Sequence, residues 1–358
     1  MFAQQRRLEY NDPHVVGGLF GSDANGWRQG IYGLAHVFGF TKIVRAFCAG
    51  SGSLLMFHEV QDKVPAGLTA GISPRLFEEL LTWLKAQGWA FVSLSDVLRW
   101  RARLPERFVC LTFDDGYRDF RAGALPVLER HGAPFVLYVP TGAVTRNLYA
   151  WWLGLRELLL TNDVVDIKAM GTRFNCAGLG EKINAYRMIV CWIRQDYDRK
   201  FALAPVFAAA GISLEELNER YYLDECELKL LSRHPLATIA AHTSSHAALS
   251  TLSIDDARLE ITENRRFLEN LVQRPVVDLA YPYGDENSCG PREGMLAASE
   301  GFRSAVTSRS GQIWPQHRES PFALPRIGIS TVESRAVIDG RLSGIRGLLS
   351  PARRIVTW

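Results

Sequence analysis

The chain has 358 residues, of which 47% are hydrophobic and 22% charged, and its mean hydropathy of −0.04 is typical of a soluble globular protein. This composition excludes wholesale disorder, a multi-span membrane protein and a fibrous repeat, and the length allows one large α/β domain or about two to three smaller ones. Lys and Arg number 41 against 38 Asp and Glu. With a net charge of +3 and no basic run longer than a pair, the chain shows no electrostatic footprint for nucleic acid.

The N-terminal part, residues 1–50, carries little periodic pattern and is expected to be an irregular extension. Its polar start contains Glu9 and Asp12, whereas a signal peptide places a short apolar core after a basic start. Residues 31–50 are the most apolar early stretch, but charged side chains interrupt them, so we interpret them as a surface helix. We therefore expect no transmembrane segment and a cytoplasmic location.

Strands alternate with helices after this extension. Short apolar runs predict buried strands at 54–57, 89–92, 108–113 and 134–139. Apolar residues at helical spacing predict helices over 73–88, 94–100 and 120–131. The first of these helices has Ser73 as its cap and Pro74 at its first position. Such alternation indicates parallel pairing with right-handed crossovers, which defines an α/β fold.

Residues 147–235 interrupt the alternation and are expected to form a helical insertion, with helices near 151–160, 183–197 and 223–231. The alternation then resumes with strands at 236–241, 276–280, 304–306 and 322–324, and with helices over 253–272 and 292–300. Residues 51–334 are thus expected to form the catalytic domain around the insertion. Residues 335–358 are expected to form a basic, weakly patterned tail.

Three polar turns follow apolar strands, at the strand ends where α/β proteins bind ligands. The first turn, 112–117, contains the adjacent carboxylates Asp114 and Asp115 and then Gly116 and Tyr117. Charges next to a buried strand cost free energy unless they are paired or bound to metal. An Asp-Asp-Gly sequence is also common in plain turns, because Asp and Gly favour turn geometry for local reasons.

The second turn contains His242 and His246, directly after the strand at 236–241. Imidazole is the commonest metal ligand among side chains, although a pair at this spacing also arises by chance on surfaces. Together with the carboxylates of the first turn, two imidazoles favour a metal site with open positions for water and substrate. The third turn, 280–284, contains Tyr281, Pro282 and Tyr283, and by itself it is a proline-fixed aromatic turn.

In this order, the three turns resemble the first three motifs of the polysaccharide deacetylases, carbohydrate esterase family 4, which includes the nodulation-type chitooligosaccharide deacetylases. The resemblance spans roughly residues 54–330. It implies a distorted (β/α)7-type barrel and hydrolytic removal of N-acetyl groups from an amino-sugar glycan. It also implies a divalent metal, usually zinc.

The resemblance also implies a role for each residue. Asp114 corresponds to the general base, and Asp115, His242 and His246 correspond to the metal ligands. The division is physically sensible, because a carboxylate on a metal is neutralised while its free neighbour can accept a proton. The backbone N–H of Tyr283 would stabilise the oxyanion. Three further side chains are expected next to the substrate: Tyr117, Tyr281 and Pro282.

Two departures from the family pattern affect the expected acid–base residues. The third motif usually begins with an Arg that holds the base, but here the residue is Ala280, so we expect Arg326 to supply the guanidinium from another strand end. No apolar strand ending in His occurs near the C-terminus, whereas the run 55–58 ends in His58. We therefore expect a circularly permuted member with His58 as general acid, and His317 as the fallback.

Other interpretations of the same residues remain open. Trp151 and Trp152 are expected to pack under the insertion, with stacking on sugar rings as the alternative. An O-acetyl esterase or another C–N hydrolase of the same fold would share these motifs. A non-catalytic glycan-binding protein is the alternative from a different class, and the presence of the base and all three ligands disfavours it.

Overall fold

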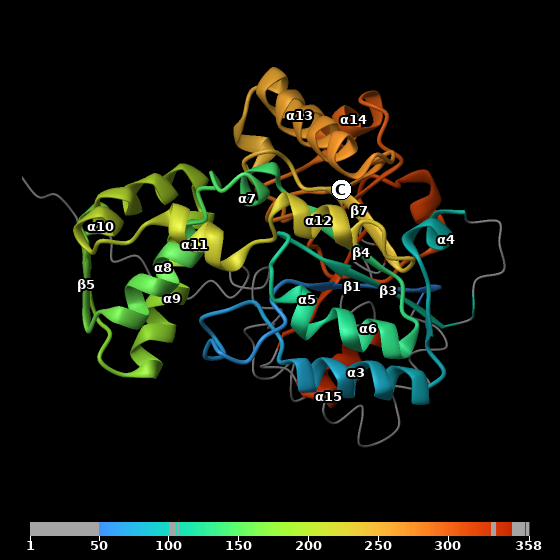
Figure 1. Ribbon diagram of the computed structural model, residues 1–358, viewed down its shortest axis with the longest axis horizontal. Helices are drawn as coiled ribbons and strands as arrows, with labels where there is room; N and C mark the ends of the chain where they lie inside the picture. The colour runs from blue at the N-terminus through green and yellow to red at the C-terminus, as the bar shows by residue number, and fades with distance from the viewer. Residues whose placement is uncertain (1–49, 100–104, 106, 331–333, 346–354, 356–357) are drawn as a thin grey trace, which may run out of the picture.

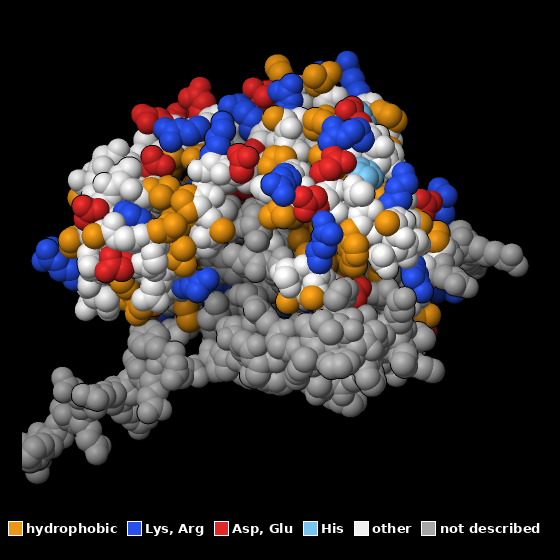
Figure 2. Space-filling model, turned by 90° about the horizontal axis from the view of Figure 1, so that it is seen from below, with side chains coloured by type: hydrophobic (Ala, Val, Ile, Leu, Met, Phe, Trp, Pro, Cys, Tyr) orange, Lys and Arg blue, Asp and Glu red, His pale blue; other side chains and the backbone are white. Residues whose placement is uncertain are grey.

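The computed structural model describes residues 50–99, 105, 107–330, 334–345, 355 and 358. The expectations for an irregular extension over 1–50 and a surface helix over 31–50 fall, except for Gly50, outside these residues. None of the described helices is both long enough and apolar enough to cross a bilayer. Acidic and basic side chains are interspersed over the described part of the face drawn in Figure 2, which agrees with the small net charge.

A parallel sheet forms the centre of the molecule (Figure 1). Its strands run in the order β10-β1-β3-β4-β7-β8-β9, and β2 (Ala90–Phe91) pairs with the start of β3. The strands in this path are β1 (Gly52–Phe57), β3 (Phe108–Phe113), β4 (Phe135–Val139), β7 (Ala237–Ala241), β8 (Asp278–Ala280), β9 (Ser304–Val306) and β10 (Ile327–Gly328). The sheet is curled into a half-barrel, which confirms the predicted α/β fold class.

The two edges of the half-barrel approach each other at one point. Val306, the last residue of β9, forms a parallel bridge with Leu324, and the chain then continues into β10 beside β1. The prediction of a strand over 322–324 was wrong in detail: only Leu324 makes a bridge there, and the regular strand begins at Ile327. The bridge places the segment containing Arg326 between the two edges.

Alternation along each strand separates two cores. Successive side chains of a strand point to opposite faces, and on β1 Leu54 packs inside the half-barrel whereas Leu55 packs outside it. The inner cluster joins apolar side chains from most strands, among them Cys110, Val136, Tyr138, Ala240, Ala280 and Val306. The outer face is covered by helices, including α3 (Pro74–Ala86), α6 (Leu125–His131), α13 (Ile254–Val272) and α14 (Pro291–Ser299).

Helix α3 begins at the cap that the sequence predicts, and α13 has a cap of the same kind. Ser73 accepts a hydrogen bond from the N–H of Leu76 at the start of α3, and Ser253 caps α13 in the same way. The single helix expected over 120–131 is instead divided into α5 (Phe120–Gly123) and α6. Pro126 explains the division, because it has no N–H to continue the hydrogen bonding of α5. The short helix after β2 is α4 (Leu94–Leu98).

The insertion between β4 and β7 has its own apolar core and forms the lobe beside the sheet in Figure 1. After the short α7 (Thr141–Val144), the lobe contains α8 (Trp151–Thr161), α9 (Leu179–Arg194), α10 (Ala204–Ala209) and α11 (Leu214–Tyr221). The last helix before β7, α12 (Glu225–Leu231), lies over the sheet and packs on its outer core. Three of these helices were predicted. The antiparallel hairpin of β5 (Val164–Ile167) and β6 (Thr172–Asn175) was not, so the insertion is not purely helical.

The segment after β10 is more ordered than its sequence pattern predicts. Residues 335–358 were expected to be a weakly patterned tail, but α15 (Arg335–Leu342) is a capped helix. Ile338 and Leu342 belong to the outer core, and Arg341 donates a hydrogen bond of 2.8 Å to the carbonyl of Gly328. The helix therefore packs on the half-barrel next to the strand that supplies Arg326.

Candidate metal centre and acid–base site

The carboxyl ends of the parallel strands meet at one mouth of the half-barrel. Side-chain alternation continues past the end of each strand, so the inward direction of Cys110 on β3 is repeated two and four residues later, at Thr112 and Asp114. The same alternation extends the inner face of other strands to His58, His242 and Arg326. The polar residues singled out in the sequence thus follow apolar residues that line the barrel interior.

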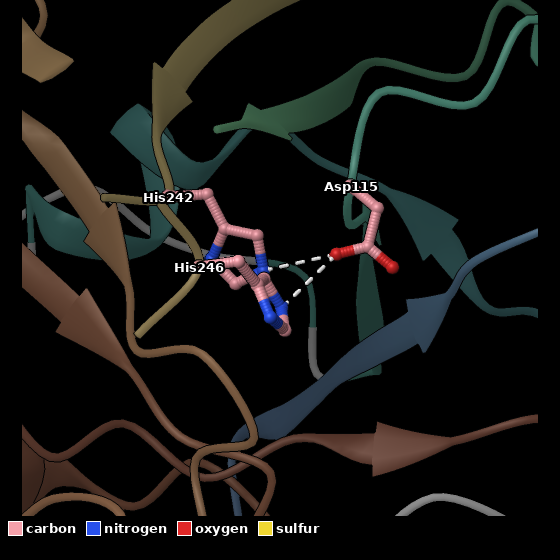
Figure 3. Close-up of side chains that lie close together, drawn as sticks. All are labelled: Asp115, His242 and His246. Atoms are coloured by element: carbon pink, nitrogen blue, oxygen red, sulfur yellow. Dashed lines mark ion pairs between the residues drawn. The ribbon is translucent and has the colours of Figure 1, made fainter. Parts of the chain in front are cut away.

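Asp115, His242 and His246 face one another at this mouth (Figure 3). Oδ1 of Asp115 lies 3.3 Å from Nε2 of His242 and 3.3 Å from Nε2 of His246. One potential ligand atom from each residue lies within 4.8 Å of the other two. All three residues are buried. Residues that are more than a hundred positions apart in the sequence therefore form one compact cluster.

The donor set of this cluster fits a divalent metal. Oδ1 of Asp115 is buried and accepts no well-formed hydrogen bond from the described residues, although two imidazole nitrogens face it. A buried carboxylate oxygen of this kind carries a large desolvation cost unless a cation neutralises it. Two imidazoles and one carboxylate are ligands that zinc takes in catalytic sites, with coordination positions left open.

The protonation states of the cluster also bear on metal binding. Burial raises the pKa of Asp115, but its contacts with His242 and His246 outweigh burial and hold the pKa of the carboxyl well below its usual range. Burial lowers the pKa of His246, which keeps that ring neutral at pH 7. For His242, the two carboxylates Asp115 and Asp114 outweigh burial and raise the pKa, so a proton and a cation compete for this ring.

The turns that carry these residues have unusual backbone geometry. Asp115, His246 and Tyr283 have φ angles of 71°, 56° and 62°, and each left-handed non-glycine residue costs on the order of 1–3 kcal/mol. At Gly284, a Cβ atom would lie 2.5 Å from the backbone nitrogen of Ser308, so only glycine fits. Such strain persists only where the surrounding structure enforces it, and here it occurs in the turns after β3, β7 and β8.

His242 is held in place by two hydrogen bonds. Its Nδ1 lies 2.8 Å from the carbonyl oxygen of Ala280, so this nitrogen carries the proton and Nε2 faces Asp115. Its backbone N–H donates to Oδ1 of Asn264 at 2.8 Å, and Asn264 in turn donates to the carbonyl of Val139. A fully buried asparagine on α13 thus ties the ends of β4 and β7 together.

Asp114 has a different partner from Asp115. Nη1 of Arg326 donates to its Oδ1 at 2.6 Å, and Nη2 donates to its Oδ2 at 2.7 Å. Both residues are buried, and Nε of Arg326 donates to the carbonyl of Thr307 at 2.9 Å. Burial raises the pKa of Asp114, but the guanidinium outweighs it and holds the pKa below its usual value. Asp114 is therefore a fixed, ionised carboxylate beside the cluster.

The sequence matches the polysaccharide deacetylase family over residues 101–187 and 193–289, slightly more than half of the chain. The chain belongs to this family. Together with the half-barrel, this match confirms the family predicted from the three turns. Members of the family generally depend on a divalent metal, and the Asp115–His242–His246 cluster is a possible site for one.

This chain is similar in sequence to two proteins named as deacetylases, one of which, YxkH, is named a putative polysaccharide deacetylase. It is 28% identical over 123 residues to the poly-β-1,6-N-acetyl-D-glucosamine N-deacetylase of Escherichia coli K12, a match that covers 29% of this chain and 18% of that protein. It is 19% identical over 282 residues to YxkH of Bacillus subtilis, covering 77% of this chain and 71% of YxkH.

Solved structures share the fold of this family member. IcaB from Ammonifex degensii superposes with a TM-score of 0.53 at 17% identity, covering 82% of this chain and 97% of that one. The Streptococcus pyogenes deacetylase PplD, solved with acetate, superposes with a TM-score of 0.51 at 20% identity, covering 77% of this chain and 91% of that one.

One pocket of this polysaccharide deacetylase joins the Asp115–His242–His246 cluster and the residues that the sequence predicts as acid and base. It has an empty volume of about 670 Å³, and the half-buried His58 lines it together with Asp114, Asp115 and Arg326. The expectation that His58 lies near His242 and His246 thus agrees with the geometry. His317 is not among the lining residues; it is buried and accepts a hydrogen bond from the N–H of Trp314.

The remaining predicted residues differ in their placement. Tyr117, Tyr281 and Tyr283 line the pocket, whereas Pro282 lies in the same turn as the latter two but is not among the lining residues. Tyr281 donates its hydroxyl to the carbonyl of Phe322 at 3.0 Å. Burial raises the pKa of Tyr283, so its hydroxyl stays protonated. Arg326 contacts Asp114, as we expected because Ala280 replaces the arginine that usually begins the third motif.

Sequence reasoning missed two charged residues of the pocket wall. Glu59 and Arg156, each 3% exposed, form an ion pair in which Nη1 of Arg156 lies 2.9 and 2.7 Å from the two carboxylate oxygens. A sequence signal existed for Arg156, because it is the only charged residue on the buried side of an otherwise apolar helix, α8. Asn264 had a similar signal, since it lies at helical spacing with the buried Ile261 and Leu268.

Proposed function

We propose that this protein is a metal-dependent hydrolase that removes N-acetyl groups from an amino-sugar glycan. The observation that carries the proposal is the convergence of an Asp-His-His cluster with a separate, arginine-held carboxylate in one pocket. The name of the Escherichia coli relative makes poly-β-1,6-N-acetyl-D-glucosamine the first substrate to test.

The chain's own residues account for the proton transfers of amide hydrolysis. Asp114 accepts a proton from the attacking water, and Arg326 keeps its carboxylate ionised and oriented. His58 donates a proton to the departing amine nitrogen as the C–N bond breaks, which yields acetate and a free amine. The backbone N–H of Tyr283 donates to the carbonyl oxygen as negative charge develops on it.

Asp115, His242 and His246 would hold the metal, most simply zinc. A bound divalent ion supplies Lewis acidity toward the water and the acetyl carbonyl. Asp114 is not needed as a metal ligand, because the three residues of the cluster supply the ligand atoms. Its two carboxylate oxygens instead accept hydrogen bonds from Arg326. This division of labour between adjacent carboxylates requires both protein partners, the imidazoles for Asp115 and the guanidinium for Asp114.

The test is acetate release from poly-β-1,6-N-acetyl-D-glucosamine and from chitooligosaccharides, before chelation, after chelation and after zinc is restored. We expect release that chelation abolishes and zinc recovers. Release only from O-acetylated glycans would instead establish an esterase. Tight glycan binding without acetate release in the presence of zinc would establish a binding protein and contradict the proposal.

A further inference from the structure

The two histidines of the cluster are held in different ways. His242 has a backbone carbonyl partner for Nδ1, as metal-ligating histidines almost always have. Nδ1 of His246 is buried and has no hydrogen-bond partner among the described residues. Among the described residues, no hydrogen bond at Nδ1 therefore fixes the rotation of the His246 ring, although its Nε2 must face Asp115 to complete the cluster.

Aromatic rings enclose His246 instead. The ring of Trp152 lies with its centroid 4.9 Å from that of His246, at an interplanar angle of 55°. Tyr283 lies 4.9 Å away in an edge-to-face arrangement, and the ring of His242 also lies 4.9 Å away. A side chain packed between flat rings has few accessible rotamers, so packing can fix an orientation that a hydrogen bond otherwise fixes.

Two of these rings, those of Trp152 and Tyr283, are held by helix α8 of the insertion. Trp152 belongs to α8, and its indole N–H donates to the hydroxyl of Tyr117 at 2.8 Å. The neighbouring Trp151 donates its indole N–H to the hydroxyl of Tyr283 at 3.0 Å. Tyr117 belongs to the turn after β3 and Tyr283 to the turn after β8, so α8 connects to two of the turns that surround the cluster.

The ion pair of Arg156 with Glu59 connects α8 to the barrel a third time. Arg156 lies one helical turn after Trp152, and Glu59 follows β1 directly after His58. Because both partners of this pair are buried, removal of either would leave an unpaired buried charge, which is strongly destabilising. The first turns of α8 are therefore fixed to the ends of β1, β3 and β8.

We propose that Trp152 is a positioning residue for the metal ligand His246, and that α8 of the insertion holds it and Tyr283 in place for this purpose. The proposal rests on the metal centre of the proposed function. It gives the insertion a specific task, because without α8 the His246 ring would keep its burial but lose its orientation. The paired tryptophans thus serve the site without requiring contact with a sugar.

The test measures zinc affinity of the metal-free protein by competition with a chromophoric chelator, and the visible spectrum of the cobalt form. Trp152→Leu removes the flat ring, and Trp152→Phe keeps a ring but loses the bond to Tyr117. We expect Trp152→Leu to weaken zinc binding about 10- to 100-fold, with a smaller loss for Trp152→Phe, and both to change the cobalt spectrum. Trp192→Leu is the matched control, since Trp192 is another half-buried tryptophan of the insertion, on α9.

The outcomes separate the two proposals. If the wild-type protein binds no divalent ion, the metal centre is wrong and this inference is wrong with it. If the wild-type protein binds zinc and Trp152→Leu binds it equally well, or Trp192→Leu weakens binding as much, only the positioning role is wrong. Should Trp152→Leu not fold, as judged by circular dichroism, Trp152→Phe decides, and an unchanged affinity and cobalt spectrum would contradict the proposal.

Discussion

Asp114 and Asp115 are neighbours in the chain, yet their carboxylates have different partners. Asp114 continues the inward alternation of β3 and meets Arg326, while the left-handed backbone of Asp115 turns its carboxylate toward the two histidines. Backbone conformation, rather than side-chain chemistry, therefore assigns the two identical residues to different roles. The proposed roles lead to distinct expectations for the two amide variants.

Asp114→Asn is expected to abolish turnover and retain metal, because it removes a proton acceptor that contributes about 10²- to 10⁴-fold in rate. Asp115→Asn is expected to lose metal, because it removes a charged ligand. Metal content by mass spectrometry and acetate release, measured on the same preparations, check both. Metal loss in Asp114→Asn with retention in Asp115→Asn would show that the two roles are exchanged.

The proposed role of His58 as general acid can be tested by comparing substrates with different leaving groups. An amine must be protonated to depart, whereas a phenolate departs without help from an acid. We therefore expect His58→Gln to lower kcat on an N-acetylated glycan by about 10²- to 10⁴-fold and to spare hydrolysis of an aryl acetate ester. Equal losses on both substrates would show that His58 does not act as the acid, and metal content serves as the control.

Residues that stand in a strand-end turn were predictable from the sequence, and residues that support them were not. Asp115, His242 and His246 each follow an apolar run, so strand order alone places them at one mouth. Asn264 acts from the middle of a helix through the backbone of His242. Its helical spacing with Ile261 and Leu268 indicates that it is buried, but its hydrogen-bond partner depends on how α13 packs against β7, which no local sequence pattern encodes.

Elements were predicted where their periodicity was strong. The strand β3 was predicted with its observed bounds, and the predicted cap of α3, Ser73, was correct. The β5–β6 hairpin was missed because each strand has only four residues, which is too short for an alternating pattern to stand out in the sequence. The same segment lies between helices, so the helical pattern around it dominated the interpretation of the insertion.

A second polar contact joins the insertion to the turn after β8. Arg194 of α9 and Asp285 form an ion pair, in which the side chains are 6% and 20% exposed, and Tyr197 donates to the same carboxylate at 2.9 Å. Burial raises the pKa of Asp285, but Arg194 outweighs it and lowers the pKa below its usual value. The pair therefore contributes to stability only when the carboxylate is ionised.

Arg194→Met is expected to lower the free energy of unfolding by about 3 kcal/mol at pH 7, because it leaves a largely buried carboxylate without its cation. A carboxyl with a depressed folded-state pKa stabilises above its unfolded pKa, about 3.9, and loses this effect as the pH falls through the folded value. The difference between wild type and variant should therefore shrink below about pH 4.

Urea denaturation of both proteins across this pH range checks that expectation. Arg75→Met is the control, because Arg75 pairs with Glu79 on the surface with 86% of its side chain exposed. Such pairs contribute about 0–1 kcal/mol. If the difference in free energy of unfolding between wild type and Arg194→Met stays constant down to pH 3, the charge of Asp285 is not what Arg194 stabilises.

At the scale of the whole molecule, the parallel half-barrel followed from the alternation of strands and helices, but its closure did not. Closure depends on a single bridge at Leu324 and on the two-residue strand β10, and neither is long enough to produce a periodic pattern. The contribution of α15 was missed for the same reason. Its buried residues, 337–342, are consecutive rather than spaced at helical intervals, and only their contact with β10 and the outer core shows that they stabilise the barrel.

Leu342→Ala tests whether α15 is part of the barrel's core. Leu342 is fully buried in the outer cluster, so truncation removes apolar contacts and leaves a cavity, at an expected cost of about 2–5 kcal/mol. Leu230→Ala is the control, since Leu230 is 62% exposed and such changes stay within about 0.5 kcal/mol. Urea denaturation measures both. Equal midpoints for the two variants would mean that α15 is dispensable for stability, whereas a large loss for Leu342→Ala would show that the helix beside β10 is part of the barrel's core.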